Sequence, residues 1–467
     1  LHMLRSQLGS DLFRKAIKIY LERHRHGNVV TENLRAAIEE VSGNSFDRFF
    51  DQYVFHAHHP EFKIDYSWDQ KAKLAKISVR QEQKVDHNVM LFQLSLPVRF
   101  RVGEQTIDRS MLVSKVVEDF YFALPASPGV VRIDPELTWL AKTTFTPPVA
   151  MLHAQLADQK DVIGRLLAID SLGKRKDKTT VAKLKDTLNK DFFYGVRMAA
   201  SKALRGIADE TAFKALRAST KQSDARVRRQ VVTDVGSFYK PAALATVKKA
   251  LAGEKNPAVR AAAIKALSGF DDAVADELVR KALGSTSFRH ELADAAVAAL
   301  RKQDDPANIA PLLKALQTDS KKFTSRGLGS GMKTLAYLAR NEEDKAKTRR
   351  FLLARVNHLN PRIRLAAIES LGQLGDPKAI AVLEKFAVGD EDSPERKNAE
   401  AAIEKLRVAR KPVDDFKNLR KEVTDLRKAN QDLDKQLEDL KKRFEAASIP
   451  EAKPDEPSDK PDKKADD

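Results

Sequence analysis

The chain contains no cysteine, so histidines and carboxylates are its candidate metal ligands, and disulfides or a cysteine nucleophile are excluded. A zinc peptidase motif needs two histidines separated by three residues on one helix, with a glutamate after the first histidine as general base. The nearest match is His290-Glu291-Leu292-Ala293-Asp294, in which aspartate replaces the second histidine. Because this run shares the period of its neighbours, we interpret it as a chance match.

Other histidines cluster near the start of the chain. His56, His58 and His59 fall in a predicted loop, where their density could bind a metal, but no carboxylate is expected at ligand spacing beside them. We therefore favour a surface or interdomain role. His24 and His26 come at a predicted helix end, where a cationic ring suits the helix dipole. The sequence thus assigns no catalytic residue, no cofactor-binding residue and no metal ligand.

The longest pattern is a helical repeat between residues 161 and 410. An apolar residue and an arginine come before a run of alanines and a leucine, as in the stretch from Val259 to Leu267. The arginines of successive repeats, Arg165, Arg197, Arg228 and Arg260, are 32, 31 and 32 residues apart. A period of this size predicts a solenoid of two-helix units, each of which buries its apolar face against its neighbours.

These units resemble HEAT repeats of the short bacterial type. In HEAT repeats such an arginine typically bridges to an aspartate of an adjoining unit, and the resemblance implies a similar interior ladder here. Asp170, Asp224 and Asp376 are candidate partners. The glycine-rich run Ser325–Gly331 lacks the Gly-Lys-Ser/Thr ending and the preceding strand of a phosphate-binding loop. We interpret it as a loosened repeat or a bend, and so as the predicted hinge.

Two segments precede the repeats. Residues 1–60 carry apolar residues at helical spacing, and the last predicted helix is aromatic along one side. Over residues 61–147 apolar and polar residues alternate, which predicts six or seven short strands in a small antiparallel sandwich. The predicted fold is therefore mainly α, with a helical segment, a β-sandwich and a HEAT-type solenoid in that order.

The first sixty residues resemble one stretch of the M1 zinc aminopeptidases, which are gluzincins. In that family a helix reading LHMLR leads into helices that end in FFxQW and GxP patterns. The matching positions are Leu1 to Arg5, Leu8-Gly9, Phe13, Tyr20, Asn28, Thr31, Leu34, Glu39, Ser42-Gly43, Phe49-Phe50, Gln52 and His59-Pro60. The chain departs from the family at Tyr53, where tryptophan is usual, and at His58, where glycine is usual.

This resemblance implies that residues 1–60 end a thermolysin-like catalytic lobe and that the family's β-domain follows. It also implies that zinc in the parent enzyme activates water to hydrolyse the N-terminal bond of peptide substrates. None of the matching residues is a zinc ligand or a catalytic group, and the start at Leu1-His2-Met3 inside a helix suggests a chain cut from a longer one. We therefore expect the zinc motif upstream and an inactive fragment. The alternative is a non-catalytic M1-like scaffold that binds acidic protein partners.

Residues 413–446 predict a coiled coil beyond the repeats. Apolar residues alternate in steps of three and four from Phe416 to Phe444, with Asn430 at one position of the a type. A single asparagine at an a position favours a coiled coil of two parallel helices, so we expect a homodimer. The alternative is that one amphipathic helix docks on the last repeat. Residues 447–467 lack large apolar side chains and are expected to be disordered.

The net charge of +17 arises in the repeats, where residues 161–410 hold 48 Lys and Arg against 31 Asp and Glu. Such a field attracts acidic partners, but the basic residues are not interleaved with aromatic ones, as stacking on bases would require. A solvated lysine-rich face is favoured and nucleic acid is not an expected partner. No run of about 18 apolar residues predicts a membrane span. None of these features predicts the compartment.

Overall fold

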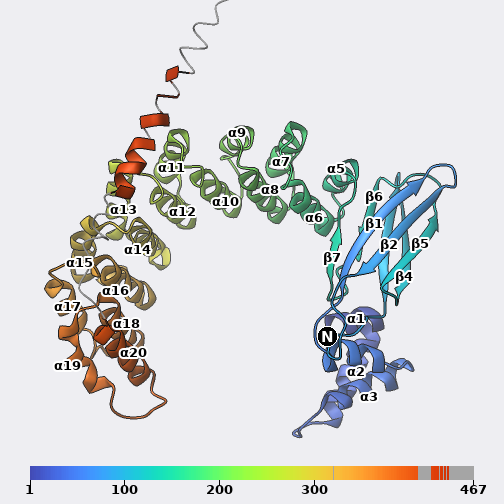
Figure 1. The fold of residues 1–467 in the computed structure, drawn as a ribbon, viewed down its shortest axis with the longest axis horizontal. Helices are drawn as coiled ribbons and strands as arrows, with labels where there is room; N and C mark the ends of the chain where they lie inside the picture. Colours follow the sequence, from blue (N-terminus) through green and yellow to red (C-terminus); the bar gives the residue numbers. More distant parts are fainter. Residues whose placement is uncertain (319, 409–421, 431, 435, 438, 441–467) are drawn as a thin grey trace, which may run out of the picture. The chain divides into compact units, whose positions relative to one another are not determined.

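A computed structural model of the chain describes residues 1–318, 320–408, 422–430, 432–434, 436–437 and 439–440. The fold is mainly α, as predicted, with strands confined to one part of the chain (Figure 1). The chain divides into two compact units. The first consists of Leu1–Asp305 with Thr318–Gly327, and the second of Pro306–Gln317 with the residues from Leu328 onward.

The N-terminal segment is a small helical bundle. Its elements are α1 (His2–Leu8), α2 (Ser10–Arg23), α3 (Thr31–Ser42), α4 (Asp47–Phe50) and the π-helical turn η1 (Asp51–Phe55). Gly9 and Gly43 end α1 and α3 with φ of 77° and 69°, a region that glycine adopts without steric cost. The buried side chains that hold the bundle together are Leu4, Ala16, Ile38, Phe46, Phe49 and Phe50.

Seven strands follow as a sandwich of two sheets. They are β1 (Glu61–Asp69), β2 (Leu74–Gln81), β3 (Leu94–Val102), β4 (Gln105–Val113), β5 (Val117–Ala123), β6 (Val130–Ile133) and β7 (Lys142–Phe145). One sheet has the order β5-β2-β1-β7 and the other the order β4-β3-β6. The predicted antiparallel sandwich is confirmed, with one parallel pair at its edge, where β7 lies beside β1 and Glu61 is opposite Lys142. The chain crosses between the sheets before β7, and this crossover leaves no period in the sequence.

Alternation along the strands builds the sandwich core. In β3, every second residue from Leu94 to Phe100 is buried, and Ala75, Ile77 and Val79 do the same in β2. Burying one face of each sheet against the other removes this apolar surface from water, which is the main stabilising contribution. Met151, from the first repeat helix, packs into the same core.

The helical bundle and the sandwich share buried glutamines and aromatic rings. Gln52 donates from Nε2 to the carbonyl of Gln93 at 3.1 Å and accepts from its backbone N–H at 2.5 Å, so its amide pairs with the chain leading into β3. The ring of Tyr53 stacks on Trp139, with centroids 6.0 Å apart, and lies 5.6 Å from the ring of Phe92. These contacts join the bundle to both sides of the sandwich.

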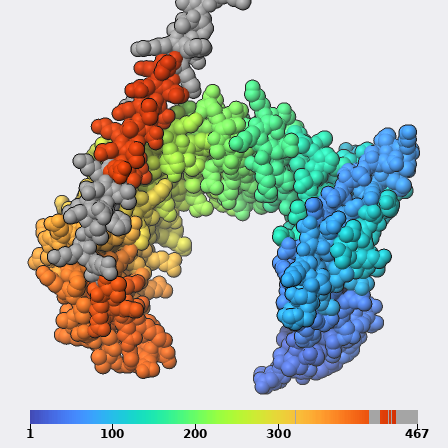
Figure 2. Space-filling model, viewed as in Figure 1, coloured from blue at the N-terminus to red at the C-terminus, as the bar shows by residue number. Residues whose placement is uncertain are grey.

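The repeats of the first unit begin directly after the sandwich as a row of helices (Figure 1), whose atoms form a continuous band in the space-filling view (Figure 2). Arg132 of β6 pairs with Asp161, and Arg101 of β3 pairs with Asp158, so two ion pairs fix the first repeat to the sandwich. The helices are α5 (Val149–Ala157), α6 (Val162–Leu172), α7 (Lys178–Lys190), α8 (Tyr194–Ile207), α9 (Glu210–Ala218), α10 (Ala225–Gly236), α11 (Pro241–Gly253), α12 (Pro257–Leu267), α13 (Ala273–Leu283) and α14 (Glu291–Gln303).

Side-chain caps set where many of these helices begin. Asp177 and Asp209 each accept a hydrogen bond from a backbone N–H in the first turn of the helix that follows, and Asn256 does the same at α12. Such caps satisfy backbone donors that have no partner inside the helix. The described helices include none that is long and apolar enough to cross a bilayer.

The later helices are α15 (Ile309–Thr318), α16 (Ser325–Ala339), α17 (Ala346–Leu353), α18 (Pro361–Leu374), α19 (Ile380–Leu383) and α20 (Pro394–Val408). The prediction of a loosened repeat or bend at Ser325–Gly331 is wrong for the backbone, since this run forms the first turns of α16. Its glycines allow close packing instead. A Cβ at Gly331 would lie 2.6 Å from Leu316, and one at Gly327 would collide with the carboxylate of Asp294. One of the three boundaries between the two compact units falls within this run, between Gly327 and Leu328.

Phe416 and Phe444, the ends of the predicted coiled coil, lie outside the described residues, as does the tail 447–467. Within the predicted coiled coil, residues 422–430 are helical. The described apolar side chains of this stretch are all exposed, from 42% at Val423 to 68% at Leu440.

Candidate functional site

The repeat arginines of the first unit point into the interior, and two of them meet an acid at the start of the next repeat. Arg165, with a side chain 1% exposed, places Nε 2.8 Å from Oδ2 of Asp191, which is 7% exposed. Nε of Arg228 lies 2.6 Å from Oε2 of Glu254. Both acids stand 26 residues after their arginine, so the ladder follows the repeat period. These arginines stabilise the stack and are occupied by that role.

Two other arginines of the ladder have no acid opposite them among the contacts of the described residues. Nη1 of Arg197 donates to Oε1 of Gln222 at 3.3 Å, and Gln222 stands 25 residues later, where Asp191 and Glu254 stand in their repeats. The buried Nε atoms of Arg165, Arg197 and Arg260 have no hydrogen-bond partner, although that of Arg165 lies 2.8 Å from Oδ2 of Asp191. The ladder therefore combines rungs that hold a close ion pair with rungs that hold none, and at Arg197 the nearby charge of Asp224 acts from farther away.

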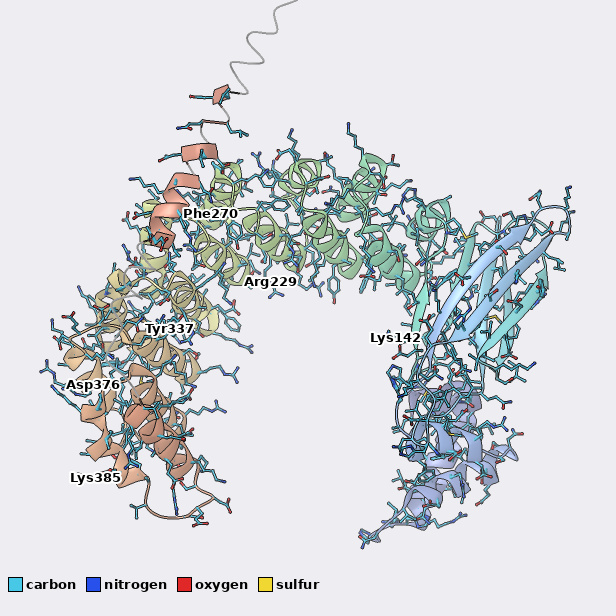
Figure 3. The ribbon with its side chains drawn as sticks, in the orientation of Figure 1. Lys142, Arg229, Phe270, Tyr337, Asp376 and Lys385 are labelled. Carbon is cyan, nitrogen blue, oxygen red and sulfur yellow. The ribbon has the colours of Figure 1, made fainter. Side chains whose placement is uncertain are left out.

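None of the aspartates predicted as ladder partners forms a close ion pair with a repeat arginine, although Asp224 lies near enough to Arg197 and Arg228 for their charges to interact. Each of them forms an ion pair with another basic residue, near the start or end of a helix (Asp376 is labelled in Figure 3). The prediction was wrong because it took conspicuous aspartates and could not place the turn before the next repeat. The observed pairs are Asp170 with Lys174, Asp224 with Arg226, Asp376 with Arg349 and, for the repeat arginine of α18, Arg364 with Glu395.

Asp234 is the most deeply buried carboxylate of the ladder region. Its side chain is fully buried between α8 and α10, where Oγ of Ser201 donates to it at 2.6 Å and Nε2 of Gln230 donates at 3.0 Å. Burial raises the pKa of Asp234, because the charged form loses its hydration, although these hydrogen bonds and nearby Arg205 act in the opposite direction. The group ties two repeats together and faces no solvent.

The run that resembles a zinc motif has the wrong geometry for one. His290 precedes α14 with φ of 56°, so it is not on the helical face that a motif of two histidines requires. Burial raises the pKa of Asp294, whose Oδ1 has no hydrogen-bond partner. The interpretation of a chance match agrees with this geometry.

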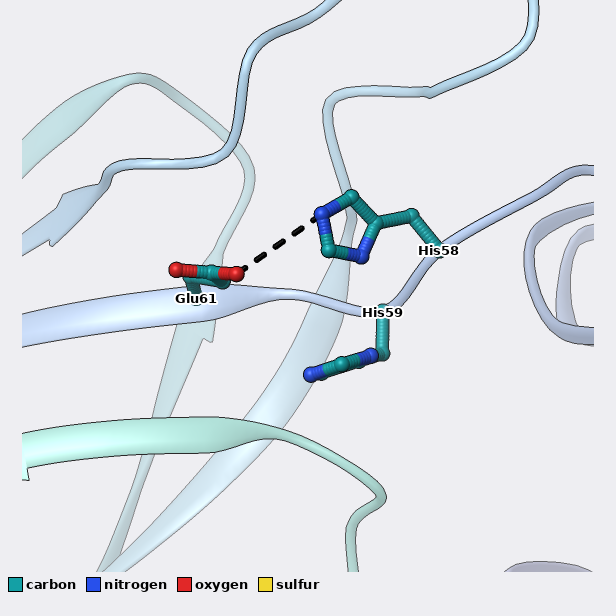
Figure 4. Close-up of side chains that lie close together, drawn as sticks. All are labelled: His58, His59 and Glu61. Atoms are coloured by element: carbon teal, nitrogen blue, oxygen red, sulfur yellow. Dashed lines mark ion pairs between the residues drawn. The ribbon is translucent and has the colours of Figure 1, made fainter. Parts of the chain in front are cut away.

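His58, His59 and Glu61 form the one group of three potential metal ligands found among the described residues. One ligand atom from each residue lies within 4.8 Å of the other two. Nε2 of His58 is 3.6 Å from Oε1 of Glu61, and the two imidazole rings lie at 84° to each other with centroids 5.0 Å apart (Figure 4).

The edge of the sheet holds the carboxylate of this group in place. Glu61 is the first residue of β1, and its backbone N–H donates to Oε1 of Gln83 at 3.1 Å. Its partner across the parallel pair, Lys142, donates from Nζ to Oε2 at 2.7 Å. This hydrogen bond is the main cause that lowers the pKa of Glu61, with the two histidines adding to it.

Sequence reasoning missed Glu61, although only Pro60 separates it from His59. The sequence predicts a loop of histidines without a carboxylate, because Glu61 is assigned to the strand segment that follows the loop. The other predicted residues stay apart from the group. His56 faces Asp51, with Nδ1 3.0 Å from its carbonyl oxygen, and His24 stacks near Tyr20. The short spacing His-His-Pro-Glu was the signal that could have found the group.

Comparisons with known proteins match the two ends of the described chain to different families. Residues 1–53 match the peptidase family M1 domain. Residues 149–235, 219–293, 244–328 and 332–404 match HEAT repeats, and these matches together cover more than half of the chain.

Curated relatives match over short parts of their length. Aminopeptidase N of Lactococcus lactis subsp. lactis is 39% identical over 54 residues, which are 12% of this chain and 6% of that protein. Aminopeptidase 2 of Candida albicans is 24% identical over 152 residues, 32% of this chain and 16% of that protein. Transcription initiation factor TFIID subunit 2 of Drosophila melanogaster is 22% identical over 203 residues, 37% of this chain and 17% of that protein.

The fold is similar to that of a solved peptidase. Aminopeptidase A of Legionella pneumophila, solved in complex with aspartic acid, superposes with a TM-score of 0.51 at 12% identity. The superposition covers 86% of this chain and 55% of that chain. The chain therefore belongs to the HEAT-repeat family, and the segment in front of its repeats is similar to part of the M1 aminopeptidases.

Proposed function

We propose that this chain is the C-terminal part of an M1-type zinc metallo-aminopeptidase that removes N-terminal residues from peptides. The main support for the proposal is the packing of the segment that matches the M1 domain against the β-sandwich that follows it. That segment ends at Tyr53, whose ring packs against Phe92 and Trp139 of the sandwich. A catalytic lobe and its following β-domain need such a shared core, whereas a free-standing HEAT module does not.

The residues of this chain do not fit the zinc site of that chemistry. A zinc aminopeptidase needs two histidines one helical turn apart and a carboxylate base, and the described helices offer only the misplaced pair of His290 and Asp294. When bound in the parent enzyme, zinc would supply an activated water. We assign no catalytic step to residues of this chain, and the proposal places the zinc ligands before Leu1.

The proposed role of this chain is therefore structural: it fixes the positions of the β-sandwich and the repeats that follow the catalytic lobe. The ion pairs of Arg132 with Asp161 and of Arg101 with Asp158 fix the first repeat to the sandwich, and the ladder from Arg165 onward stiffens the repeats that follow. Residues that bind no substrate directly can still control its position, because a small misplacement of reacting groups costs rate.

The test is the zinc content of the gene product that includes the residues before Leu1. We expect an intact zinc motif there and at least one tightly bound zinc per chain, removed together with activity by a chelator. A degenerate motif and a protein without zinc would contradict the proposal. That result would support the non-catalytic scaffold, whose basic repeats bind acidic proteins.

We also propose that the chain dimerises through residues 413–446. The exposed side chains that support this are Val423, Leu426, Leu433, Leu437 and Leu440, which a partner helix would cover. Light scattering of the chain is expected to give the mass of a dimer, and Leu426→Asp is expected to give a monomer. A monomeric chain, or a dimer that survives removal of everything after residue 412, would contradict it.

A further inference from the structure

We propose that His58, His59 and Glu61 form a binding site for a divalent transition-metal ion of the zinc class. The proposal goes beyond the aminopeptidase function, because it needs only residues of this chain. It starts from the juxtaposition of two imidazoles and one carboxylate at the beginning of β1 (Figure 4).

The spacing of the ligand atoms is close to what a metal requires. Ligands at about 2.0–2.2 Å from a tetrahedral zinc ion lie about 3.3 Å from one another. Nε2 of His58 and Oε1 of Glu61 are already 3.6 Å apart, and all three ligand atoms lie within 4.8 Å. Because His58 is exposed and His59 is half-buried, small side-chain rotations close the remaining gap and leave the site open to ions from solvent.

The carboxylate is oriented for this task. Lys142 holds Oε2 of Glu61 at 2.7 Å, which leaves Oε1 directed at His58. Metal-ligating carboxylates are commonly held by such an outer hydrogen bond, which reduces the freedom lost on binding. The backbone is fixed as well, because the N–H of Lys142 donates to the carbonyl of Pro60 at 2.9 Å and the N–H of Glu82 donates to the carbonyl of Glu61 at 2.7 Å.

The backbone at His58 supplies an independent argument. His58 has φ of 75°, a left-handed conformation that glycine adopts freely and a histidine adopts only at a steric cost. Glycine is the residue that the M1 resemblance leads one to expect at this position. The chain thus keeps an imidazole where its backbone favours no side chain, and that imidazole faces Glu61.

The donor set selects the class of ion. Two imidazole nitrogens and one carboxylate oxygen suit zinc, nickel, cobalt and copper, whereas magnesium and calcium prefer oxygen ligands alone. Three protein ligands leave at least one position for water. A bound ion would join the connection after η1 to the first strand of the sandwich, so it is expected to stabilise the junction of these two elements.

The experiment is isothermal titration of the full chain, prepared free of metal, with zinc chloride, and magnesium chloride serves as the negative titrant. We expect saturable zinc binding and no response to magnesium. Replacing a ligand by His59→Ala or Glu61→Gln is expected to weaken zinc binding by at least the roughly 10- to 100-fold that loss of an outer partner costs a metal site. Circular dichroism checks that each variant is folded.

Substitution of a second histidine by glycine provides the matched control. His26 also has a positive φ, of 60°, and is exposed, but it stands outside the group. His58→Gly and His26→Gly should both raise the unfolding temperature of the metal-free chain, because each relieves backbone strain. Only His58→Gly should also abolish the rise in unfolding temperature that zinc causes in the unmodified chain.

Two results would overturn the proposal. One is the absence of zinc binding by the folded, unmodified chain. The other is zinc binding that persists unchanged in His58→Gly, His59→Ala and Glu61→Gln, which would place the ion elsewhere. Neither result bears on the proposed aminopeptidase function. That function is tested by the zinc content of the longer gene product, measured with His59→Ala so that the group at the start of β1 contributes no zinc.

Discussion

The sandwich junction and the repeats bury polar groups in opposite ways. At the junction, neutral amides pair with the backbone, as when Gln81 donates to the carbonyl of Phe92 at 2.7 Å and accepts from its N–H at 3.0 Å. In the repeats, the same need is met by charges, as between Arg165 and Asp191. A neutral pair loses little hydration when it is buried, whereas a buried ion pair is stable only while both partners are present. The repeats should therefore be the more sensitive region to loss of a single partner.

Asp191→Ala is expected to have the largest effect. It leaves the guanidinium of Arg165 buried without its counter-charge, which should destabilise the first repeats by about 3–5 kcal/mol. Hydrogen exchange of the amides of α6 and α8 measures the local free energy of opening. The comparison is Gln222→Ala at the rung of Arg197, where the guanidinium loses an uncharged partner and Gln222 loses its bonds to Asn189 and Ser219, and about 1.5–3 kcal/mol is expected. Equal losses in the two variants would contradict the contrast between charged and neutral rungs.

Gln81→Ala probes the other side of the comparison. The N–H and carbonyl of Phe92 lose their two hydrogen bonds with Gln81, and at about 0.5–1.5 kcal/mol for each bond the sandwich should lose about 1–3 kcal/mol. The readout is hydrogen exchange in β2 and β3. Gln105→Ala, at an exposed glutamine of β4, is the control and should change exchange little. A loss larger than that of Asp191→Ala would reverse the predicted order.

Much of the fold follows from periodicity. The arginine spacing predicts the repeats, and alternation from Phe62 onward predicts the strands, because both patterns report which face of an element is buried. The partners of the arginines could not be predicted in the same way. Asp191 and Glu254 lie in turns, and which turn residue faces an arginine depends on how two repeats pack.

The candidate metal site shows the same limit more sharply. His58 and His59 stood out by type, but Glu61 meets them only because β1 begins there and β7 pairs in parallel beside it. The crossover to β7 is a tertiary choice that no local pattern encodes. The helix over the glycine-rich run is missed for a related reason, because close packing, as of Gly331 against Leu316 and of Gly329 against Ala366, outweighs the low helix propensity of glycine.

Asp234→Asn is expected to have a smaller, pH-dependent effect. Since burial raises the pKa of Asp234 in the folded state, the folded chain holds this proton more tightly than the unfolded chain. The stability that this provides is present below the unfolded pKa of about 3.9 and is lost as pH rises through the folded pKa. The unmodified chain should therefore weaken relative to Asp234→Asn as pH rises, by on the order of 1 kcal/mol in α8 and α10. A difference that does not change with pH would contradict this account.

Asp170→Ala should have the smallest effect. Its ion pair with Lys174 is exposed on one face of α6, and such pairs contribute about 0.3–0.5 kcal/mol. A loss of this size in hydrogen exchange of α6, shrinking further at high salt, is expected. A loss of stability approaching that of Asp191→Ala would show that burial does not determine how much an ion pair stabilises these repeats.

The most direct test of the central claim is the rate of hydrolysis of an aminoacyl arylamide. It compares this chain with the gene product that includes the residues before Leu1. The account predicts hydrolysis by the longer protein, inhibited by a zinc chelator, and none by this chain alone. Hydrolysis by this chain alone, or none by a folded longer protein with zinc bound, would contradict it.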